Sequence, residues 1–302
     1  MKKYIILGLI AILSSCQKPE ESFITGLDSN FEKYLVEYKI DKDGIINGKM
    51  NLQDSKGVDS LYIGSLGIRS LAGIENFIDL KLLYCFSNNL TELNLSSNTN
   101  LTDFDCGNNN LKFLDLTLNS RLERIICWNN KLTSLLIGEK QYLTNLLCAN
   151  NQLQSIDVSK CAKLFALTCY QNQLKSLNVE NNKSLGNLSC SDNELQELNV
   201  FNNVYLETLS FSNNKVSSMD ISQNLKLDIL SCANNKLSAL DTRKQFDIRY
   251  LDCSNNQIKT ICVGDIEKAT ANSKIPRWNG SINGFTSYYW KIDNSTNFSY
   301  CK

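Results

Sequence analysis

Apolar and polar residues recur with a period of 21 along the middle of the chain. In each period a short stretch alternates apolar and polar positions around a cysteine, and an asparagine follows that cysteine three positions later. The cysteine position is filled by Cys85, Cys106, Cys127, Cys148, Cys169, Cys190, Phe211, Cys232 and Cys253. The asparagines are Asn88, Asn109, Asn130, Asn151, Asn172, Asn193, Asn214, Asn235 and Asn256. Because a short alternating strand buries one face, and can do so only against neighbours, the repeat predicts parallel strands stacked into a solenoid.

Each repeat carries a second apolar pair on the far side of the turn, such as Leu114 with Leu116. A repeat of 21 residues leaves no room for a full helix there, so we expect an extended or short-strand segment. The asparagine column is best explained as structural, because its amides can bond backbone groups that the turns leave unpaired. A second asparagine column is formed by Asn98, Asn119, Asn182, Asn203 and Asn224, and is interrupted by Lys140, Cys161 and Gln245.

One unit, residues 101–111, follows the pattern L-x-x-L-x-C-x-x-N-x-L. This pattern resembles the leucine-rich repeat, with cysteine at the third leucine position. The 21-residue form is similar to repeats of internalins and of many Bacteroidetes surface proteins. The resemblance implies a repeat solenoid of horseshoe form, with a parallel β-sheet on the concave face and extended or short-strand segments on the convex side. For function it implies only a binding or adhesion module.

The N-terminus has the features of an export signal. Residues 1–3 are a basic start and residues 4–13 an apolar run, too short to span a bilayer, which needs about 20 residues. Residues 13–16 then resemble a bacterial lipobox, which implies a signal peptide over residues 1–15, acylation of Cys16 and a lipidated tether over residues 16–27. Lys18, followed by Glu20 and Glu21, resembles the surface-export signal of Bacteroidetes lipoproteins. We therefore expect an outer-membrane protein held by its lipid and exposed at the cell surface.

Both ends of the array are expected to be capped, since a solenoid otherwise exposes its core. We expect a small helical cap over residues 28–60, leucine-rich repeats over 61–263 and a short irregular cap over 264–302, which contains Pro276, Trp278 and Trp290. Ser29 and Glu32 have the spacing of a capping box. Asp41 and Asp43 resemble the start of a calcium loop, but the later glycine and glutamate are missing, which favours a simple Asp-Gly turn.

The cysteines fall into two groups. Stacked strands lie about 4.8 Å apart with parallel side chains, whereas a disulfide needs converging side chains with Cβ atoms about 3.8 Å apart. We therefore expect the ladder cysteines to be free, buried thiols rather than disulfides or metal ligands. Cys262 and Cys301 lie outside the ladder in an exported chain, so we predict that they form its only disulfide, with Cys161 unpaired. Closing this loop of about 40 residues could contribute roughly 3–4 kcal/mol.

The composition of the chain excludes several classes of function. The 31 basic residues balance 31 acidic ones, which argues against nucleic-acid binding. The chain has no histidine, so catalysis by a Ser-His-Asp or Cys-His arrangement and zinc sites containing histidine are excluded. We expect no catalytic residues, no cofactor and no metal, and a membrane contact through the N-terminal lipid alone. The favoured function is non-catalytic binding of a protein or glycan partner; the alternative is a structural or regulatory lipoprotein that faces the periplasm.

Strand positions next to each cysteine point away from the core and form columns across the concave face. Large apolar side chains gather there in the first five repeats, while the later repeats carry mostly small polar ones. An exposed apolar cluster of this kind tends to mark an interaction site. The alternation of large and small residues after each cysteine predicts slots between the aromatic rings, for example at Gly107. The predicted ligand-binding residues are Tyr84, Phe86, Asp103, Asp105, Arg124, Ile126, Trp128, Leu147 and Tyr170.

Overall fold

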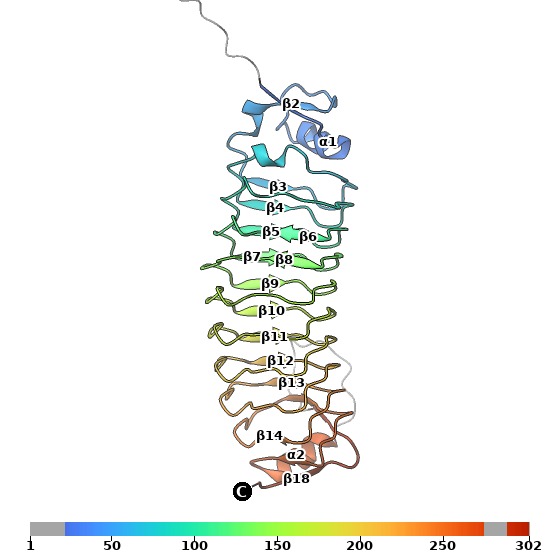
Figure 1. The fold of residues 1–302 in the computed structure, drawn as a ribbon, viewed down its shortest axis with the longest axis vertical. Helices are drawn as coiled ribbons and strands as arrows, with labels where there is room; N and C mark the ends of the chain where they lie inside the picture. Colours follow the sequence, from blue (N-terminus) through green and yellow to red (C-terminus); the bar gives the residue numbers. More distant parts are fainter. Residues whose placement is uncertain (1–21, 275–288, 302) are drawn as a thin grey trace, which may run out of the picture.

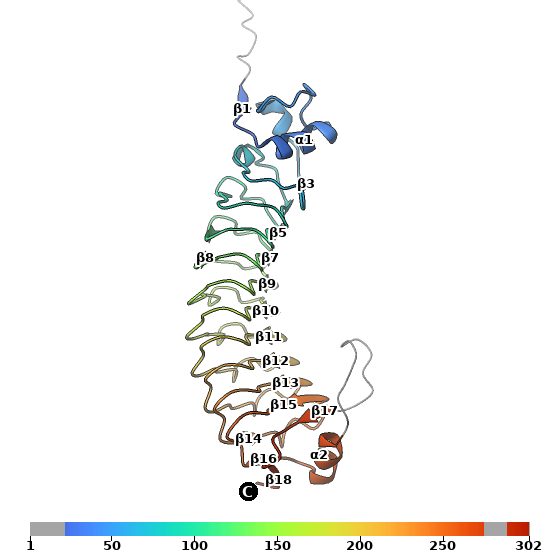
Figure 2. The same ribbon diagram turned by 90° about the vertical axis from the view of Figure 1, so that its right-hand side faces the viewer.

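The computed structural model describes residues 22–274 and 289–301, which form an elongated, gently curved solenoid (Figures 1 and 2). Across these residues, one parallel sheet of eleven strands runs along the inner side of the curve. Its strands are β3 (Ser60–Tyr62), β4 (Leu82–Tyr84), β5 (Asp103–Asp105), β7 (Arg124–Ile126), β9 (Asn145–Leu147), β10 (Ala166–Thr168), β11 (Asn187–Ser189), β12 (Thr208–Ser210), β13 (Ile229–Ser231), β15 (Tyr250–Asp252) and β17 (Tyr289–Lys291). From β4 to β15 each strand pairs with residues 21 positions away, as in Phe104 opposite Ile125, so the predicted stack of parallel strands is confirmed.

The core is a column of apolar side chains between the two sides of each coil. The central residue of each strand and the ladder residue two positions later both point inward and are buried. Phe211, the one non-cysteine on the ladder, is fully buried, and the ladder cysteines are free thiols, as expected. Burial raises the pKa of the Cys148 thiol to about 12, and the other ladder thiols are shifted in the same direction. These thiols therefore stay protonated and act as small core residues.

The first asparagine column links neighbouring coils through side-chain hydrogen bonds to the backbone, as predicted. Asn109 shows the pattern: its amide donates to the carbonyls of Cys85 and Cys106 at 3.0 and 3.1 Å, and its Oδ1 accepts from the backbone N of Leu90 at 3.0 Å. In the second column, Asn119 donates to the carbonyls of Leu95 and Asn98. The asparagines therefore fill backbone bonding sites that the turns leave open, which is a structural role.

A third feature of each turn was not predicted. The residue two positions after each ladder residue has a left-handed backbone, with φ between 51° and 56°. Asparagine and aspartate tolerate this region better than other residues with a side chain. The positions are Ser87, Asn108, Asn129, Asn150, Gln171, Asp192, Asn213, Asn234 and Asn255. Several also bond side chain to side chain along the stack, as in Asn129 Nδ2 to Asn108 Oδ1 at 2.8 Å.

The outer side of the coils is extended with a few short strands, as expected. These are β6 (Phe113–Asp115) paired with β8 (Ser134–Leu136), and β14 (Leu240–Asp241), β16 (Thr260–Cys262) and β18 (Asn297–Ser299) in a second sheet. An aspartate or asparagine ends many of these segments by accepting a hydrogen bond from the backbone two residues later, as in Asp115 Oδ1 from Thr117 N at 2.8 Å. Such turns reverse the chain without a helix.

The N-terminal cap contains β1 (Phe23–Thr25), α1 (Ser29–Glu37), β2 (Lys49–Asn51) and the 3₁₀ helices η1 (Leu52–Ser55) and, in the first coil, η2 (Ile74–Asn76). The predicted capping box is wrong. Asp28, not Ser29, caps α1 by accepting from the backbone N of Asn30 and Phe31. The Glu32 carboxylate is buried and instead accepts backbone hydrogen bonds from residues 47–49, so it holds the loop before β2.

The C-terminal cap is more regular than predicted. It contains α2 (Ile266–Ser273) and a further coil in which β17 extends the inner sheet and β18 the outer one. Trp290 lies opposite Leu251 and donates from Nε1 to the carbonyl of Ile248 at 3.0 Å. The structure joins Cys262 to Cys301 in a disulfide, the pair expected from the sequence, and Cys161 is a free, buried thiol.

Several sequence predictions concern residues outside the described part of the chain. The signal peptide, the lipobox with Cys16 and the export signal precede residue 22, and Pro276 and Trp278 lie in the undescribed segment 275–288. Among the described helices, none has the length and apolar character needed to cross a membrane.

Candidate functional site

The inner face of the sheet presents three side chains per coil: the first and third strand residues and the residue after the ladder position. The strand residues are half-buried in every coil from β4 to β15, while the central residue between them is buried. All the predicted binding residues lie on this face, either in the strands β4, β5, β7 and β9 or two positions after the end of β4, β7 or β10. The alternation of strand side chains therefore brings them together on one surface.

A hydrogen-bonded cluster crosses three neighbouring strands at the N-terminal end of this face. Arg124 donates from Nε to both carboxylate oxygens of Asp103 at 3.0 Å, and its Nη2 lies 2.8 Å from Asp103 Oδ2. The same Nη2 donates to the Tyr84 hydroxyl at 2.8 Å, and the guanidinium lies 5.8 Å from the centre of the Tyr84 ring. Hydrogen bonding to Asp103 raises the pKa of Arg124, and burial raises the pKa of Tyr84. The cluster holds these side chains in fixed positions.

The predicted slots between aromatic rings are not present. A Cβ atom added to Gly107 would lie 2.6 Å from Nε1 of Trp128, and one added to Gly64 would lie 2.6 Å from the Phe86 ring. Each ring therefore lies against the glycine of the preceding coil and fills the space predicted to be open. Both rings remain 38% exposed, so they form a surface that a partner can cover, not a notch that a partner can enter.

The remaining predicted residues extend this surface. Ile126 lies beside Leu147 on the next strand, and both are half-buried. Tyr170 follows on the next coil and is also half-buried, with Ala149 buried on the coil between it and Trp128. The result is a largely apolar strip that runs from β4 to Tyr170, just after β10, beside the Arg124 cluster.

Asp105 is the acidic residue within this strip. Its Oδ1 accepts a hydrogen bond from the backbone N of Gly107 at 2.8 Å. Its strand neighbours are Tyr84 on β4 and Ile126 on β7, so apolar groups flank the carboxylate. Burial raises the pKa of Asp105, and the opposing effects of the Gly107 hydrogen bond and of Arg124 are smaller. The carboxylate is therefore poorly stabilised by its own chain.

The C-terminal half of the face carries small hydroxyl side chains and ends in a pair of stacked tyrosines that was not predicted from the sequence. Ser212 and Ser231 share a hydrogen bond of 2.8 Å between their hydroxyl oxygens. Near the end of the sheet, Tyr250 and Tyr289 stack with ring centres 5.5 Å apart. Tyr250 stands three positions before Cys253, in the column of Asp103 and Arg124, so comparing that column along the sequence could have revealed it.

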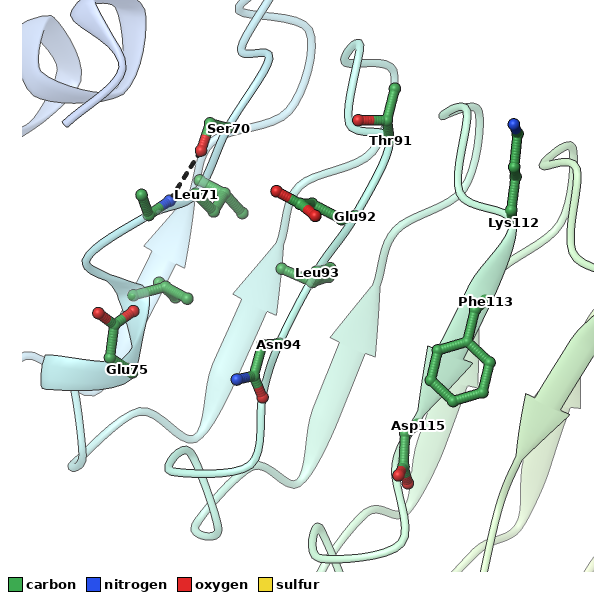
Figure 3. A pocket seen from close by; sticks show the side chains of 12 residues that line it. Ser70, Leu71, Glu75, Thr91, Glu92, Leu93, Asn94, Lys112, Phe113 and Asp115 are labelled. Carbon is green, nitrogen blue, oxygen red and sulfur yellow. Dashed lines mark hydrogen bonds between the residues drawn. The ribbon is translucent and has the colours of Figure 1, made fainter. Parts of the chain in front are cut away.

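A depression of about 470 Å³ lies away from this face, on the outer side of the first coils (Figure 3). It forms beside β6, which pairs with β8 only, and its wall includes Phe113 and the carboxylates of Glu75, Glu92 and Asp115. Asp115 is held in its turn by Thr117, and this hydrogen bonding lowers its pKa. The depression contains no nucleophile paired with a base.

In residues 22–274 and 289–301, no group of three or more acidic, cysteine or histidine side chains is placed to hold a metal ion. Asp43 accepts a hydrogen bond from the backbone N of Ile45 at 2.7 Å, and Gly44 has φ of 72°, so the segment forms the expected Asp-Gly turn. Asp41 beside it is buried with Oδ2 unpartnered, and burial, followed by the charge of Asp43, raises its pKa to about 6.

Comparisons with solved structures identify the fold. The functional domain of InlJ from Listeria monocytogenes, which includes a cysteine ladder, is 32% identical with a TM-score of 0.72, and the match covers 80% of this chain and 57% of that one. A leucine-rich-repeat protein from Leptospira interrogans is 26% identical with a TM-score of 0.51, over 63% of this chain and 58% of that one. The chain thus spans little more than half the length of these two structures.

A third neighbour is the ectodomain of the Arabidopsis thaliana receptor kinase GASSHO1/SCHENGEN3 in complex with CASPARIAN STRIP INTEGRITY FACTOR 2. It is 22% identical with a TM-score of 0.65, over 82% of this chain and 32% of that one, a similarity that shows the fold alone. No protein-family model matches the sequence, and no curated protein sequence matches it. The chain therefore adopts the leucine-rich-repeat fold.

Proposed function

We propose that this chain is a non-catalytic, lipid-anchored binding module that recognises a protein partner through the inner face of its first five repeats. One observation carries the proposal: a largely apolar strip, in which Trp128 and Phe86 rest against glycines and stay partly exposed, runs beside a prearranged Arg124 cluster. Aromatic and arginine side chains of this kind dominate the binding energy of protein interfaces. Because the rings already rest on glycines, little side-chain freedom is lost when a partner covers them.

A protein is the favoured ligand of the two classes that the sequence left open. The plant receptor ectodomain with the same fold was solved in complex with CASPARIAN STRIP INTEGRITY FACTOR 2. In this chain, the strip and its polar edge extend over β4 to β10, a length suited to an extended segment or the surface of another protein. Binding would bury the apolar strip, which supplies the driving force.

The proposed anchor is a lipid on Cys16, after removal of residues 1–15, and the proposed location is the outer surface of the outer membrane. Its support is the lipobox-like sequence. Replacing Cys16 with alanine should leave the protein unprocessed or release it from membranes. Protease treatment of intact cells should degrade the wild-type protein; survival of the protein would instead support the alternative of a periplasm-facing lipoprotein.

Photocrosslinking in the producing cells tests the binding face. Benzoylphenylalanine in place of Tyr170 should give a crosslinked protein adduct, because that position lies on the proposed face. The matched control is the same replacement at Phe201, which is 47% exposed and lies outside the inner sheet. Adducts at position 201 but not at position 170 would place the partner on another surface and overturn the proposal.

A further inference from the structure

Two aspartates occupy the same place in different coils of the inner sheet. Asp105 is the last residue of β5, and Asp252 is the last residue of β15. Each accepts a hydrogen bond from the backbone two residues later: from Gly107 at 2.8 Å and from Ser254 at 3.1 Å. The local backbone therefore presents the two carboxylates in the same way, and differences between them arise from their neighbours.

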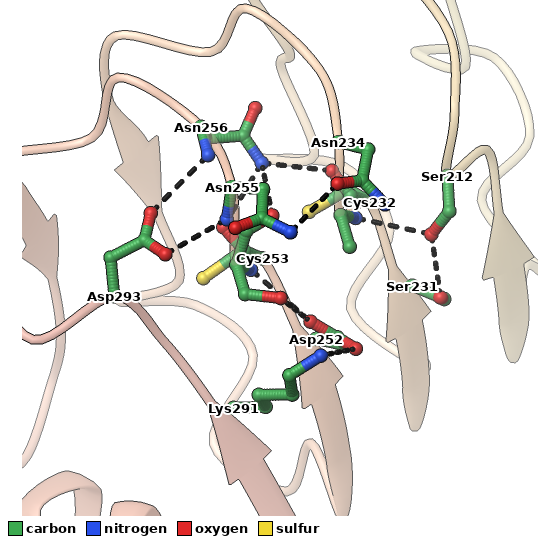
Figure 4. Close-up of polar contacts among 12 residues, drawn as sticks. Ser212, Ser231, Cys232, Asn234, Asp252, Cys253, Asn255, Asn256, Lys291 and Asp293 are labelled. Atoms are coloured by element: carbon green, nitrogen blue, oxygen red, sulfur yellow. Dashed lines mark hydrogen bonds and ion pairs between the residues drawn. The ribbon is translucent and has the colours of Figure 1, made fainter.

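The neighbours differ in charge. On the strand beside Asp252, the register places Lys291 opposite it, and the lysine Nζ lies 3.4 Å from Asp252 Oδ2 (Figure 4). On the strand beside Asp105, the register places Ile126 at the equivalent position. The chain thus supplies a cation to one aspartate of the column and an aliphatic side chain to the other.

Arg124, the cation near Asp105, does not serve as its counter-ion in the way that Lys291 serves Asp252. The Arg124 guanidinium is engaged by both oxygens of Asp103 and by the Tyr84 hydroxyl. Among the described residues, the ion pair of Arg124 is with Asp103, and Asp105 forms none. Burial has already raised the pKa of Asp105, which is the expected effect when a carboxylate is desolvated without a counter-ion.

The surroundings of Asp105 suit a cation from outside. A Cβ on Gly107 would lie 2.6 Å from Trp128 Nε1 and 3.2 Å from Asp105 Oδ1, so the indole and the carboxylate both lie close to this glycine. A carboxylate beside an aromatic ring attracts an ammonium or guanidinium group both as an ion pair and through the ring. The apolar flanks contributed by Tyr84 and Ile126 can cover the methylene stem of such a side chain.

We propose that Asp105, with Trp128 beside it, binds a lysine or arginine side chain of the partner protein and so supplies the specificity of the inner face. The inference rests on the proposed function and adds to it the chemistry of the ligand. The ion pair of Asp252 with Lys291 shows the same kind of contact made within the chain, with Lys291 in the place of the partner's basic side chain.

The experiment selects binders from a random dodecapeptide library displayed on phage, with the full-length protein in detergent micelles as target. Peptides that need the inner face are identified by their loss of binding to Trp128→Ala. These peptides should be enriched in lysine or arginine over the input library, and should bind Asp105→Asn at least about tenfold more weakly. Asparagine keeps the oxygen that accepts from Gly107, so the turn is preserved. Asp252→Asn, the matched control, should bind within about twofold of wild type.

A second measurement does not depend on the folding of a variant. Replacing the key lysine of a selected peptide by norleucine should weaken binding to the wild-type protein by about the same factor, and should have no further effect with Asp105→Asn. Peptides that need Trp128 but show no basic enrichment, or that bind Asp105→Asn normally, would overturn this inference alone. Selected peptides indifferent to Trp128→Ala would overturn the proposed function and this inference with it.

Discussion

Replacing Lys140 with asparagine tests why the second asparagine column can hold two consecutive residues that are not asparagine, Lys140 and Cys161. Lys140 is fully buried, and its Nζ donates to the carbonyl of Leu116 at 2.8 Å, the bond that an asparagine there would make to the residue 24 positions earlier. It also donates to the carbonyl of Ile137 at 2.6 Å. Residue 161 would bond that second carbonyl if it were asparagine, as Asn182 bonds Val158 one repeat later. Lysine at 140 thus makes one backbone bond of each of two column positions, and this allows Cys161 to be apolar.

The two positions should therefore be energetically coupled. Lys140→Asn alone leaves the Ile137 carbonyl without its buried donor, a loss that costs about 1–3 kcal/mol. In Cys161→Asn alone, the new amide and the Lys140 ammonium compete for the Ile137 carbonyl. This variant should lose a similar amount of folding free energy. The double variant restores the regular column, so we expect a coupling of about 1–3 kcal/mol in its favour.

The assay is urea unfolding of wild type, both single variants and the double variant, followed by far-ultraviolet circular dichroism. The free energies of unfolding form a double-mutant cycle. Asn119→Ala, in the neighbouring coil of the column, is a control for simple loss of an amide. If the effects of the two single substitutions add to within about 0.5 kcal/mol, the explanation for Lys140 and Cys161 is wrong.

Three further predictions concern single positions. Gln171 holds the left-handed turn position with φ of 52°, so Gln171→Asn should stabilise the protein by roughly 0.5–1 kcal/mol in urea unfolding, and the reverse change at Asn150 should destabilise it. The pKa of Asp41 is raised to about 6, so its charge disfavours folding above that pH, and the penalty fades as pH falls towards the ordinary aspartate pKa. The melting temperature of Asp41→Asn relative to wild type should therefore rise between pH 4 and pH 8, and a flat difference would contradict this. Cys262→Ser should lower the free energy of unfolding by about 2–4 kcal/mol, and alkylation of Cys262 in unreduced protein would refute the disulfide.

Most of the fold could be predicted because its determinants repeat. A strand, an inward ladder residue and an asparagine recur in each repeat, and each asparagine acts on backbone groups of its own and the adjacent coil. Asn109 illustrates this, since its side chain bonds Cys85 and Leu90 of the preceding coil and Cys106 and Gly107 of its own. The last coil was missed because α2 and the segment after it separate Leu251 from its strand partner Trp290, which breaks the period.

The candidate face was predicted in position but not in shape. Alternation decides which side of the sheet Trp128 occupies, but not the direction in which its ring turns. The ring turns towards Gly107 and fills the expected slot, because a glycine in the neighbouring coil leaves room for an aromatic side chain. Likewise, Glu32 lies at a capping-box position in the sequence, yet it is used by a loop 15 to 17 residues away, a contact that no local pattern contains.

The aromatic half of the inner face is proposed to bind a protein partner. The most direct measurement is the affinity of the crosslinked partner, once identified, for wild type, for Trp128→Ala with Tyr170→Ala, and for Ser210→Ala with Ser231→Ala. We expect the aromatic double substitution to weaken binding by about 2 kcal/mol or more, and the serine double substitution to have little effect. Unchanged affinity for the aromatic variant, with a loss for the serine variant, would place the binding site in the other half of the sheet.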